Sequence, residues 1–283
     1  MDIINSISEM QRTSDGLRRE GKRIGVVPTM GFLHEGHLSL MRIAKQQSDV
    51  LITTIFVNPT QFGPSEDFSK YPRDLKRDAS LAESAGTDIL FIPDEKDMYP
   101  NGYHSFVIVE QITEVLEGKS RPTHFRGVAT VVVKFFNITK PHVAVFGQKD
   151  AQQAAVVKQM AKDLNFDLEI VVAPIVRESD GLALSSRNVY LSADERRQSL
   201  ALSQSLQIAR QLVAGGEKDC SAVIRKMTRL ISSQPSARID YISIADATTL
   251  NELSLLGETD TVLVSLAVRI GSTRLIDNIL ITV

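Results

Sequence analysis

The stretch IGVVPTMGFLHEGH, residues 24–37, is the part of the chain that decides the predicted fold. Its first five residues, Ile24–Pro28, form a largely β-branched run closed by proline, which indicates a buried strand. A helical pattern follows from Gly36, because the apolar residues after it recur on one side of a helix. These residues are Leu38, Leu40, Met41 and Ile43. A strand that leads through a glycine-containing turn into a helix is the opening unit of an α/β fold.

Strand and helix patterns continue to alternate on the C-terminal side of this stretch. The predicted strands cover residues 50–57, 89–92, 143–146 and 168–172, and the predicted helices cover 74–85, 127–139 and 151–164. Strands that are buried on both faces and separated by helices indicate a doubly wound parallel sheet of the Rossmann-like type. Residues 128–133 could also form a strand, but the helical spacing of the apolar residues after them favours a helix.

The pattern changes after about residue 190. The segment Ser192–Glu195 resembles a capping box and opens a long helix, and glycines separate it from a second helix over residues 221–232. Two or three strands then close the chain, at residues 239–244, 261–269 and 275–283. Helices followed by strands indicate an α+β domain. We therefore predict a Rossmann-like domain over residues 1–176 and a smaller C-terminal α+β domain over residues 177–283.

Composition and charge narrow the class of ligand. The chain has 283 residues, of which 43% are hydrophobic, and it carries 32 Lys and Arg against 34 Asp and Glu, so disordered and fibrous classes are excluded. Residues 190–283 contain ten basic and ten acidic residues, which leaves 22 basic and 24 acidic residues in residues 1–189. Because neither part of the chain is basic, binding to nucleic acid is not expected. The apolar runs are too short to span a bilayer, so no membrane association is expected either. These exclusions favour a small ligand.

Cysteine usage and the first residues of the chain indicate the compartment. The single Cys220 cannot close an intrachain disulfide, which is typical of a reducing environment. The first five residues lack a basic region followed by an apolar stretch, so no signal peptide is expected. We therefore expect a cytoplasmic protein. Cys220 lies away from every motif, and we expect no catalytic part for it.

The segment between the first predicted strand and helix, residues 28–37, is the strongest candidate site. Ligands of doubly wound sheets bind at the carboxyl ends of strands, and a helix N-terminus presents free N–H groups to phosphate. His34 and His37 are three residues apart and can face one pocket. His34 alone could be a surface or packed histidine, and the pair could ligate zinc, but the HExxH spacing is missing and the only cysteine is distant. The neighbouring glycines favour a nucleotide site.

Two further clusters carry charge that suits phosphate. Residues 146–150 (FGQKD) follow a predicted strand, where Lys149 could neutralise a phosphate, while Asp150 could equally be a helix N-cap. Residues 184–188 (LSSRN) combine two hydroxyls with a guanidinium that could grip a polyphosphate, the alternative being a surface turn.

The two remaining clusters are polar and lie near predicted element ends. Residues 58–62 (NPTQF) end the second predicted strand, and their amides could recognise a polar substrate without an ionised group. Residues 120–127 (SRPTHFRG) open another helix. Each of the five clusters is weak when taken singly, but four of them lie at predicted strand ends or helix starts.

An ordered set of motifs over essentially the full chain resembles one family closely, the pantoate–β-alanine ligases, also called pantothenate synthetases. The matching segments are PTMGFLHEGH (28–37), IFVNPTQF (55–62), YPRDLKRD (71–78), RPTHFRGV (121–128), FGQKDAQQ (146–153) and GLALSSRN (181–188). The histidine pair is similar to the HxGH signature of the nucleotidylyltransferase superfamily, and the SSR segment looks like the KMSKS-type loop of those enzymes.

The resemblance implies a two-step reaction. ATP and (R)-pantoate would give pantoyl adenylate and pyrophosphate, and β-alanine would then displace AMP to give pantothenate. Mg²⁺ should accompany ATP, although the resemblance indicates no metal ligands. It also implies a homodimer in which the C-terminal domain acts as a lid.

The resemblance also implies roles for individual residues. His37 would be a proton donor, His34 would assist at the phosphates, and Lys149 would complete the catalytic set. Gln61 and Gln153 would bind pantoate, with Gln61 also near β-alanine. The residues implied to bind ATP are Met30, Gly31, Phe32, Leu33, His34, Glu35, Gly36, His37, Gly147, Gln148, Lys149, Asp150, Val176, Leu184, Ser185, Ser186 and Arg187.

Three positions depart from the family pattern. Gln148 replaces a frequent Glu, Thr60 a common Met and Thr123 a frequent Gly, and none of them removes a proposed catalytic group. An acyl adenylate must be protected from water, and the polar residues 63–67 are a candidate flap.

Two rival functions remain open from the sequence. A nucleotidylyltransferase of the same superfamily would need a basic acceptor pocket, whereas Gln61 and Gln153 suit an uncharged polyol better. A non-catalytic nucleotide sensor would tolerate loss of the histidine pair and of Lys149, yet both are present.

Overall fold

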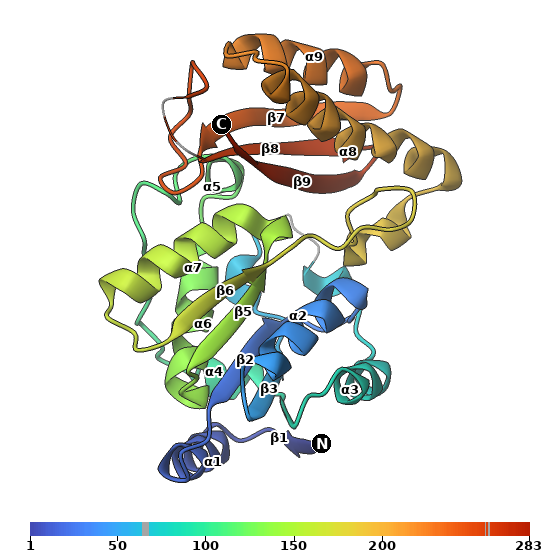
Figure 1. Ribbon diagram of the computed structural model, residues 1–283. Coiled ribbons are helices and arrows are strands. Elements are labelled where there is room, and N and C mark those ends of the chain that lie inside the picture. Colours follow the sequence, from blue (N-terminus) through green and yellow to red (C-terminus); the bar gives the residue numbers. More distant parts are fainter. Residues whose placement is uncertain (64–67, 258, 260) are drawn as a thin grey trace. The chain divides into compact units, whose positions relative to one another are not determined.

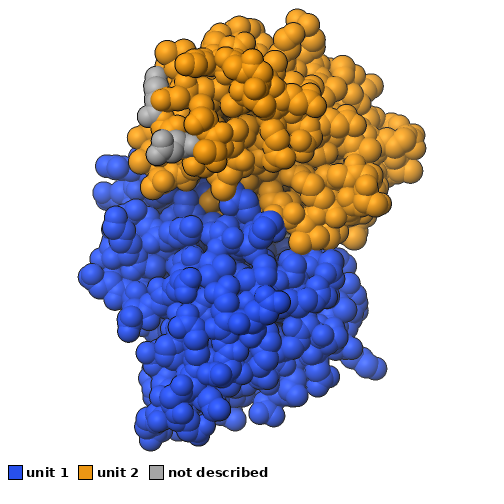
Figure 2. Space-filling view, in the orientation of Figure 1, with its two compact units in different colours: residues 1–148, 152–174 blue, residues 149–151, 175–283 orange. Residues whose placement is uncertain are grey.

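The computed structural model describes residues 1–63, 68–257, 259 and 261–283 (Figure 1). The chain forms two compact units, which Figure 2 shows in different colours. Unit 1 comprises residues 1–148 and 152–174, and unit 2 comprises residues 149–151 and 175–283. Each unit is described by itself below.

Unit 1 is built on a six-stranded sheet in which every pair of neighbouring strands is parallel. Its strands are β1 (Asp2–Ile4), β2 (Ile24–Thr29), β3 (Val50–Ile55), β4 (Ile89–Phe91), β5 (Val143–Gly147) and β6 (Glu169–Ala173), in the order β1-β4-β3-β2-β5-β6. The predicted doubly wound parallel sheet is confirmed. The strand expected over residues 50–57 ends two residues earlier, at Ile55, although the Phe56 N–H still donates to the Thr29 carbonyl of β2 at 3.0 Å.

The strand order reverses between β2 and β5. From β2 the chain steps to β3 and β4 toward one edge of the sheet, and from β5 it steps to β6 toward the other. Gly25 of β2 is paired with Val143 of β5, so the two strands are direct neighbours. A reversal of this kind leaves a crevice at the carboxyl ends of the strands, where α/β proteins bind their ligands. Thr29 and Gly147, the last residues of β2 and β5, border it.

Helices flank the sheet. In unit 1 they are α1 (Ile7–Arg19), α2 (Glu35–Gln46), α3 (Leu75–Ser84), α4 (Glu95–Met98), α5 (Glu117–Ser120), α6 (His124–Thr139) and α7 (Ala151–Asp163). Because parallel crossovers are right-handed, α2 and α3 lie on one face and α1, α6 and α7 on the other. This assignment agrees with the contacts of α2 with α3 and of α1 with α6. The short 3-10 turns η1 (Pro59–Gln61) and η2 (Phe68–Lys70) also belong to unit 1, and η3 (Gln148–Asp150) begins in unit 1 and continues in unit 2.

The apolar stripe predicted for the first helix faces the core. Leu38, Leu40 and Met41 of α2 are buried, whereas Ile43 is only partly buried. The helix predicted over residues 127–139 is α6, so the strand alternative for residues 128–133 is excluded.

Two N-terminal elements carried too weak a pattern to be predicted. β1 has three residues, two of them exposed, and α1 buries only Met10 and Ser14 among thirteen residues. β1 is too short to show an apolar periodicity, and in α1 only Ile7, Met10 and Leu17 mark the apolar side of the helix.

Unit 2 is the α+β unit that the C-terminal pattern predicts. It contains η4 (Ser186–Tyr190), α8 (Ala193–Ala214), α9 (Cys220–Ser232), β7 (Ala237–Asp246), β8 (Thr261–Ile270) and β9 (Thr273–Thr282). The three strands form an antiparallel sheet in the order β7-β8-β9. The predicted capping box is present, because Ser192 and Glu195 exchange hydrogen bonds at the start of α8.

The core of unit 2 lies between its sheet and its two long helices. Alternate residues of β8, from Val262 to Ile270, are buried against apolar residues of α8 and α9 such as Leu206 and Met227. Cys220 is 1% exposed and belongs to this core. Among the described residues of the whole chain, no helix combines the length and the apolar character that a membrane span requires.

Candidate functional site

The loop after β2 has an unusual backbone. Gly31 has a φ of 83° and Phe32 a φ of 49°, so two consecutive residues adopt the left-handed conformation. A Cβ on Gly31 would lie 3.0 Å from Asp78 Oδ2 and 3.1 Å from Ile55 Cγ2, so a side chain there would crowd both neighbours. Phe32 is not glycine, so its conformation has to be held by the surrounding structure.

The side chain of Asp78 holds the backbone of Phe32 in this conformation. Its carboxylate, on α3, accepts the Phe32 N–H at 2.6 Å and the Leu33 N–H at 2.7 Å. The Asp78 residue is 1% exposed, and its Oδ1 also lies 3.6 Å from Arg77 Nη1. The motif YPRDLKRD ends on Asp78, but no role was expected for it; its place in that motif was the one available signal.

The two histidines lie together at the start of α2. His34 is the N-cap residue, and its N–H donates to His37 Nδ1 at 3.3 Å. The ring centroids are 4.0 Å apart, and both residues are partly buried. Because Nδ1 of His37 accepts a hydrogen bond, the neutral ring carries its proton on Nε2 and can donate it to a ligand. Among the described residues no group of three or more His, Cys, Asp or Glu is arranged to hold a metal ion.

Gln61 lies next to this loop. Its side chain is buried, its Nε2 is 2.9 Å from Met30 Sδ, and its Oε1 accepts from Asn58 Nδ2 at 3.1 Å. The Gln61 carbonyl lies 2.9 Å from His124 Nδ1 and also accepts from Arg121 Nη2 at 3.4 Å. The tertiary structure thus brings three separate motifs together around Gln61.

Asn58 is the centre of a buried polar network that supports Gln61. It is 1% exposed, its Nδ2 donates to the Gly127 carbonyl at 3.1 Å, and its Oδ1 accepts from Tyr99 OH at 2.8 Å and Thr60 Oγ1 at 2.9 Å. Burial raises the pKa of Tyr99 to about 12, so its hydroxyl remains a donor at neutral pH. Thr60, where the family often has Met, takes part in this network.

The first turn of α7 presents two neighbouring amides with different surroundings. Gln152 is 5% exposed; its Oε1 accepts from the Glu117 N–H at 2.9 Å and its Nε2 donates to the carbonyls of Ile112 and Val115 at 2.8 Å. It therefore fastens the segment before α5. Gln153 is partly buried, and within the described ranges its side chain has no hydrogen-bond partner. Its amide is available for a ligand.

Of the remaining candidate residues, Gly147 and Gln148 end unit 1, and the others belong to unit 2. Lys149 and Asp150 lie in η3, and the Lys149 carbonyl accepts from Asn278 Nδ2 at 3.0 Å. The Leu184 N–H donates to the Val176 carbonyl at 3.0 Å, so these two expected residues lie side by side. Ser185 caps η4 by accepting the Arg187 N–H at 3.2 Å. Residues 64–67 of the expected flap lie outside the described residues.

Fold and site together define the class of protein. A switch point in a parallel sheet, a clamped glycine loop and an HxGH pair at a helix N-terminus are the parts of an α/β nucleotide-binding enzyme. A family model described as pantoate-beta-alanine ligase matches residues 2–280. The chain belongs to that family.

Relatives and solved structures agree with this assignment. A pantothenate synthetase of Chloroherpeton thalassium is 57% identical over 280 residues, which cover 98% of each chain. The crystal structure of pantothenate synthetase from Thermus thermophilus superposes with a TM-score of 0.93 at 42% identity, covering 99% of each chain. A pantoate-beta-alanine ligase from Francisella tularensis, solved with βγ-ATP and β-alanine, has a TM-score of 0.82 at 38% identity and covers 99% of this chain and 97% of its own.

Proposed function

We propose that the loop after β2 and the neighbouring strand ends carry out the reaction of the family in this chain. That reaction is the ATP-dependent condensation of (R)-pantoate with β-alanine to pantothenate, AMP and pyrophosphate, through a pantoyl adenylate. The observation that supports the site most strongly is the His34–His37 pair, which lies on a loop clamped by Asp78 beside Gln61.

The nucleotide would bind along the loop and the start of α2. The N-terminus of α2 supplies free N–H groups and a positive dipole end for the phosphates. We assign His37 Nε2–H as the donor to a phosphate oxygen, with His34 beside it. The other ATP contacts fall on Gly147–Asp150, Val176 and Leu184–Arg187. Asp150 is exposed and Arg187 partly buried, so both can respond to a ligand.

In the first step the pantoate carboxylate attacks the α-phosphorus, and pyrophosphate leaves. Two negatively charged groups must approach each other, so cationic and hydrogen-bonding groups have to offset their repulsion. Lys149, Arg187 and the histidine pair provide such groups. Loss of one preorganised donor of this kind typically slows the reaction about 10²–10³-fold.

Pantoate would be held by two amides. Gln61 is fixed by the Asn58 network, and the amide of Gln153 is available, so the pair offers donors and acceptors to hydroxyl groups without adding charge. In the second step the neutral amine of β-alanine attacks the adenylate carbonyl near Gln61. The carbon–nitrogen bond forms, AMP leaves, and the amine gives up a proton.

Mg²⁺ is part of the proposal as the companion of ATP. The described residues form no three-ligand cluster, which suits an ion held chiefly by nucleotide phosphates and water. When bound, the ion would neutralise phosphate charge. The residues of this chain would still orient the nucleotide through the loop after β2.

Three broader features complete the proposal. We infer a homodimer by analogy with the family, and a cytoplasmic location from the single cysteine, which is buried. The division at residue 176 and the role of residues 177–283 as a lid are also kept as proposals. Exclusion of water by a lid would protect the acyl adenylate from hydrolysis.

Product analysis separates this function from its two rivals. We expect AMP release from ATP only when both pantoate and β-alanine are present. A nucleotidylyltransferase would instead require a phosphate-ester acceptor, and a nucleotide sensor would release no AMP.

Replacement of the proposed donors tests the site. His37→Ala and Lys149→Ala should each slow pyrophosphate release by about 10²–10³-fold while the far-UV circular dichroism stays unchanged. His104→Ala and Lys158→Ala remove exposed side chains of the same types and should leave the rate unchanged. Near-normal pyrophosphate release by either of the first two variants would show that its role is assigned wrongly.

A further inference from the structure

Residues 176–184 of unit 2 form a tight hairpin that leads into the segment Ser185–Arg187. Arg177 and Ala183 form an antiparallel bridge, and the Glu178 N–H donates to the Leu182 carbonyl at 2.8 Å. The turn contains Gly181 with a φ of 95°, a conformation that glycine adopts without strain. The hairpin itself is therefore well defined by its backbone.

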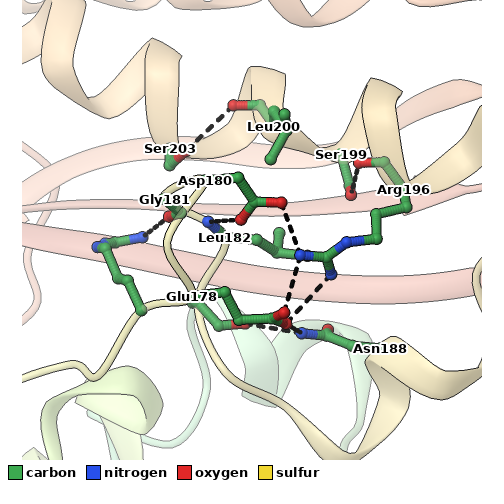
Figure 3. Close-up of polar contacts among 11 residues, drawn as sticks. Glu178, Asp180, Gly181, Leu182, Asn188, Arg196, Ser199, Leu200 and Ser203 are labelled. Atoms are coloured by element: carbon green, nitrogen blue, oxygen red, sulfur yellow. Dashed lines mark hydrogen bonds and ion pairs between the residues drawn. The ribbon is translucent and has the colours of Figure 1, made fainter.

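The side chain of Glu178 joins this hairpin to two other segments (Figure 3). Its Oε1 accepts from Asn188 Nδ2 at 3.0 Å, and Asn188 belongs to η4. Its two oxygens also accept from Arg196 Nη1 at 3.1 Å and Nη2 at 2.8 Å, and Arg196 lies in the first turn of α8. One carboxylate thus connects the hairpin, η4 and α8.

Further contacts strengthen the same connection. Arg196 Nη2 lies 2.6 Å from Asp180 Oδ2, so the guanidinium bridges two carboxylates of the hairpin. Asn188 Nδ2 also donates to the Ala183 carbonyl at 3.1 Å, so its amide is oriented by two acceptors. On its other side the hairpin is held by a bidentate pair between Arg177 and the buried Asp277, with N–O distances of 2.7 and 2.8 Å.

The burial of the network distinguishes it from ordinary surface ion pairs. The side chains of Arg196, Glu178 and Asp180 are 30–34% exposed, whereas the pair Arg197–Asp194 on the same helix is 71% and 66% exposed. Bidentate geometry and shared partners make such a network more rigid than a single exposed pair. The network therefore restrains residues 178–188 to one conformation.

We propose that Glu178, Arg196 and Asn188 are positioning residues for the nucleotide segment Ser185–Arg187. Asn188 follows Arg187 directly within η4, a helix with three residues per turn, so holding Asn188 also holds the backbone from which the Arg187 side chain extends. The network holds Ser185, Ser186 and Arg187 ready for the phosphates, so that less freedom is lost when ATP binds. This inference rests on the proposed function, because that function assigns the segment to ATP.

Kinetics can separate positioning from a purely structural role. Loss of stability alone lowers the fraction of folded enzyme and leaves the KM for ATP unchanged. Loss of positioning raises the KM for ATP, while the KM for β-alanine stays the same.

The test compares four variants by steady-state kinetics and thermal unfolding. Glu178→Gln keeps the shape of the side chain but removes its charge, and Asn188→Ala removes the link from η4. Each should raise the KM for ATP about tenfold, the effect of losing one hydrogen bond to a charged group. The double variant should raise the KM for ATP little more than either single variant does, because both substitutions break the same link. The control, Asp240→Asn, removes a carboxylate that is 19% exposed and pairs with Arg274 elsewhere in unit 2, and it should leave the KM for ATP unchanged.

A second measurement covers variants that fold poorly. Asp180→Asn leaves the ion pair between Glu178 and Arg196 in place. It should raise the rate of hydrogen exchange at the backbone amides of residues 183–188. It should also raise the KM for ATP, by a smaller factor than Glu178→Gln does. A KM for ATP within about twofold of the parent for Glu178→Gln and Asn188→Ala overturns the inference. Failure of the proposed function is a separate outcome, because the unmodified protein would then release no AMP with both organic substrates.

Discussion

At the scale of single residues, the conformation of the loop after β2 depends on one buried carboxylate. Asp78 accepts two backbone N–H groups from a segment that is 45 and 46 positions away in the sequence. A carboxylate with two such donors stabilises a backbone that would otherwise be strained at Phe32. The same contact places His34 and His37 at the start of α2.

Asp78→Asn should weaken both the fold and nucleotide binding. An asparagine keeps the shape but offers one acceptor where two are needed, so one of the two N–H groups would face an NH₂ group. We expect the free energy of unfolding to fall by about 1–3 kcal/mol, measured by urea denaturation, and the KM for ATP to rise.

The matched control for this prediction lies on the same helix. Asp74 is the exposed N-cap residue of α3, where asparagine caps as well as aspartate. Asp74→Asn should therefore leave both stability and the KM for ATP nearly unchanged. Equal effects of the two substitutions would contradict the role of Asp78 as a clamp.

At the scale of elements, helix α6 packs very closely against the turn η1. A Cβ on Gly127 would lie 2.3 Å from the Thr60 carbonyl oxygen, a distance that no side chain can adopt. The Gly127 carbonyl in turn accepts from Asn58 Nδ2. Gly127 is therefore needed for the network that positions Gln61.

Gly127→Ala should displace η1 from α6. We expect the free energy of unfolding to fall by about 1–3 kcal/mol or more, and the KM for pantoate to rise because Gln61 moves. Gly16→Ala is the control in helix α1, where nothing lies within 4 Å of the added Cβ. It should raise the free energy of unfolding by about 0.4–1 kcal/mol, since alanine restricts the unfolded chain. A neutral result for Gly127→Ala in the same chemical denaturation experiment would rule out the close approach.

At the scale of the whole molecule, stability has two sources, since each unit has its own apolar core. The sheet of unit 1 also carries a titratable histidine contact, at the end opposite the candidate site. The backbone N–H of Ile24 donates to the ring Nδ1 of His142 at 2.9 Å, and the backbone N–H of His142 donates to the Ile24 carbonyl at 2.8 Å. Burial, together with Arg18 and Arg23, lowers the pKa of His142 from its usual 6.5.

The pH dependence of unfolding should reflect this contact. Because the folded state disfavours the protonated ring, the stabilisation is present above about pH 6.5 and is lost as the pH falls toward the lowered pKa. His142→Asn keeps an acceptor at the position of Nδ1 but does not titrate, so it should lose less stability than the parent between about pH 7 and pH 5. Urea denaturation at several pH values measures this, with the exposed His104→Asn as control. Parallel curves for the parent and His142→Asn would disprove the effect.

The sequence by itself determined the parallel sheet, the α+β character of unit 2 and the family. Buried strands, apolar helix faces, caps and glycine turns each depend on residues that are close together in the sequence. The sequence also indicated the loop at residues 28–37, since a strand end and a helix start meet there. Only the tertiary structure decided that Asp78 holds this loop and that the absence of a side chain at Gly127 lets η1 pack against α6. It also decided that Glu178 binds both Asn188 and Arg196. Each of these contacts joins residues from separate elements, so no local pattern encodes it. It forms only when packing brings a buried donor and its acceptor together.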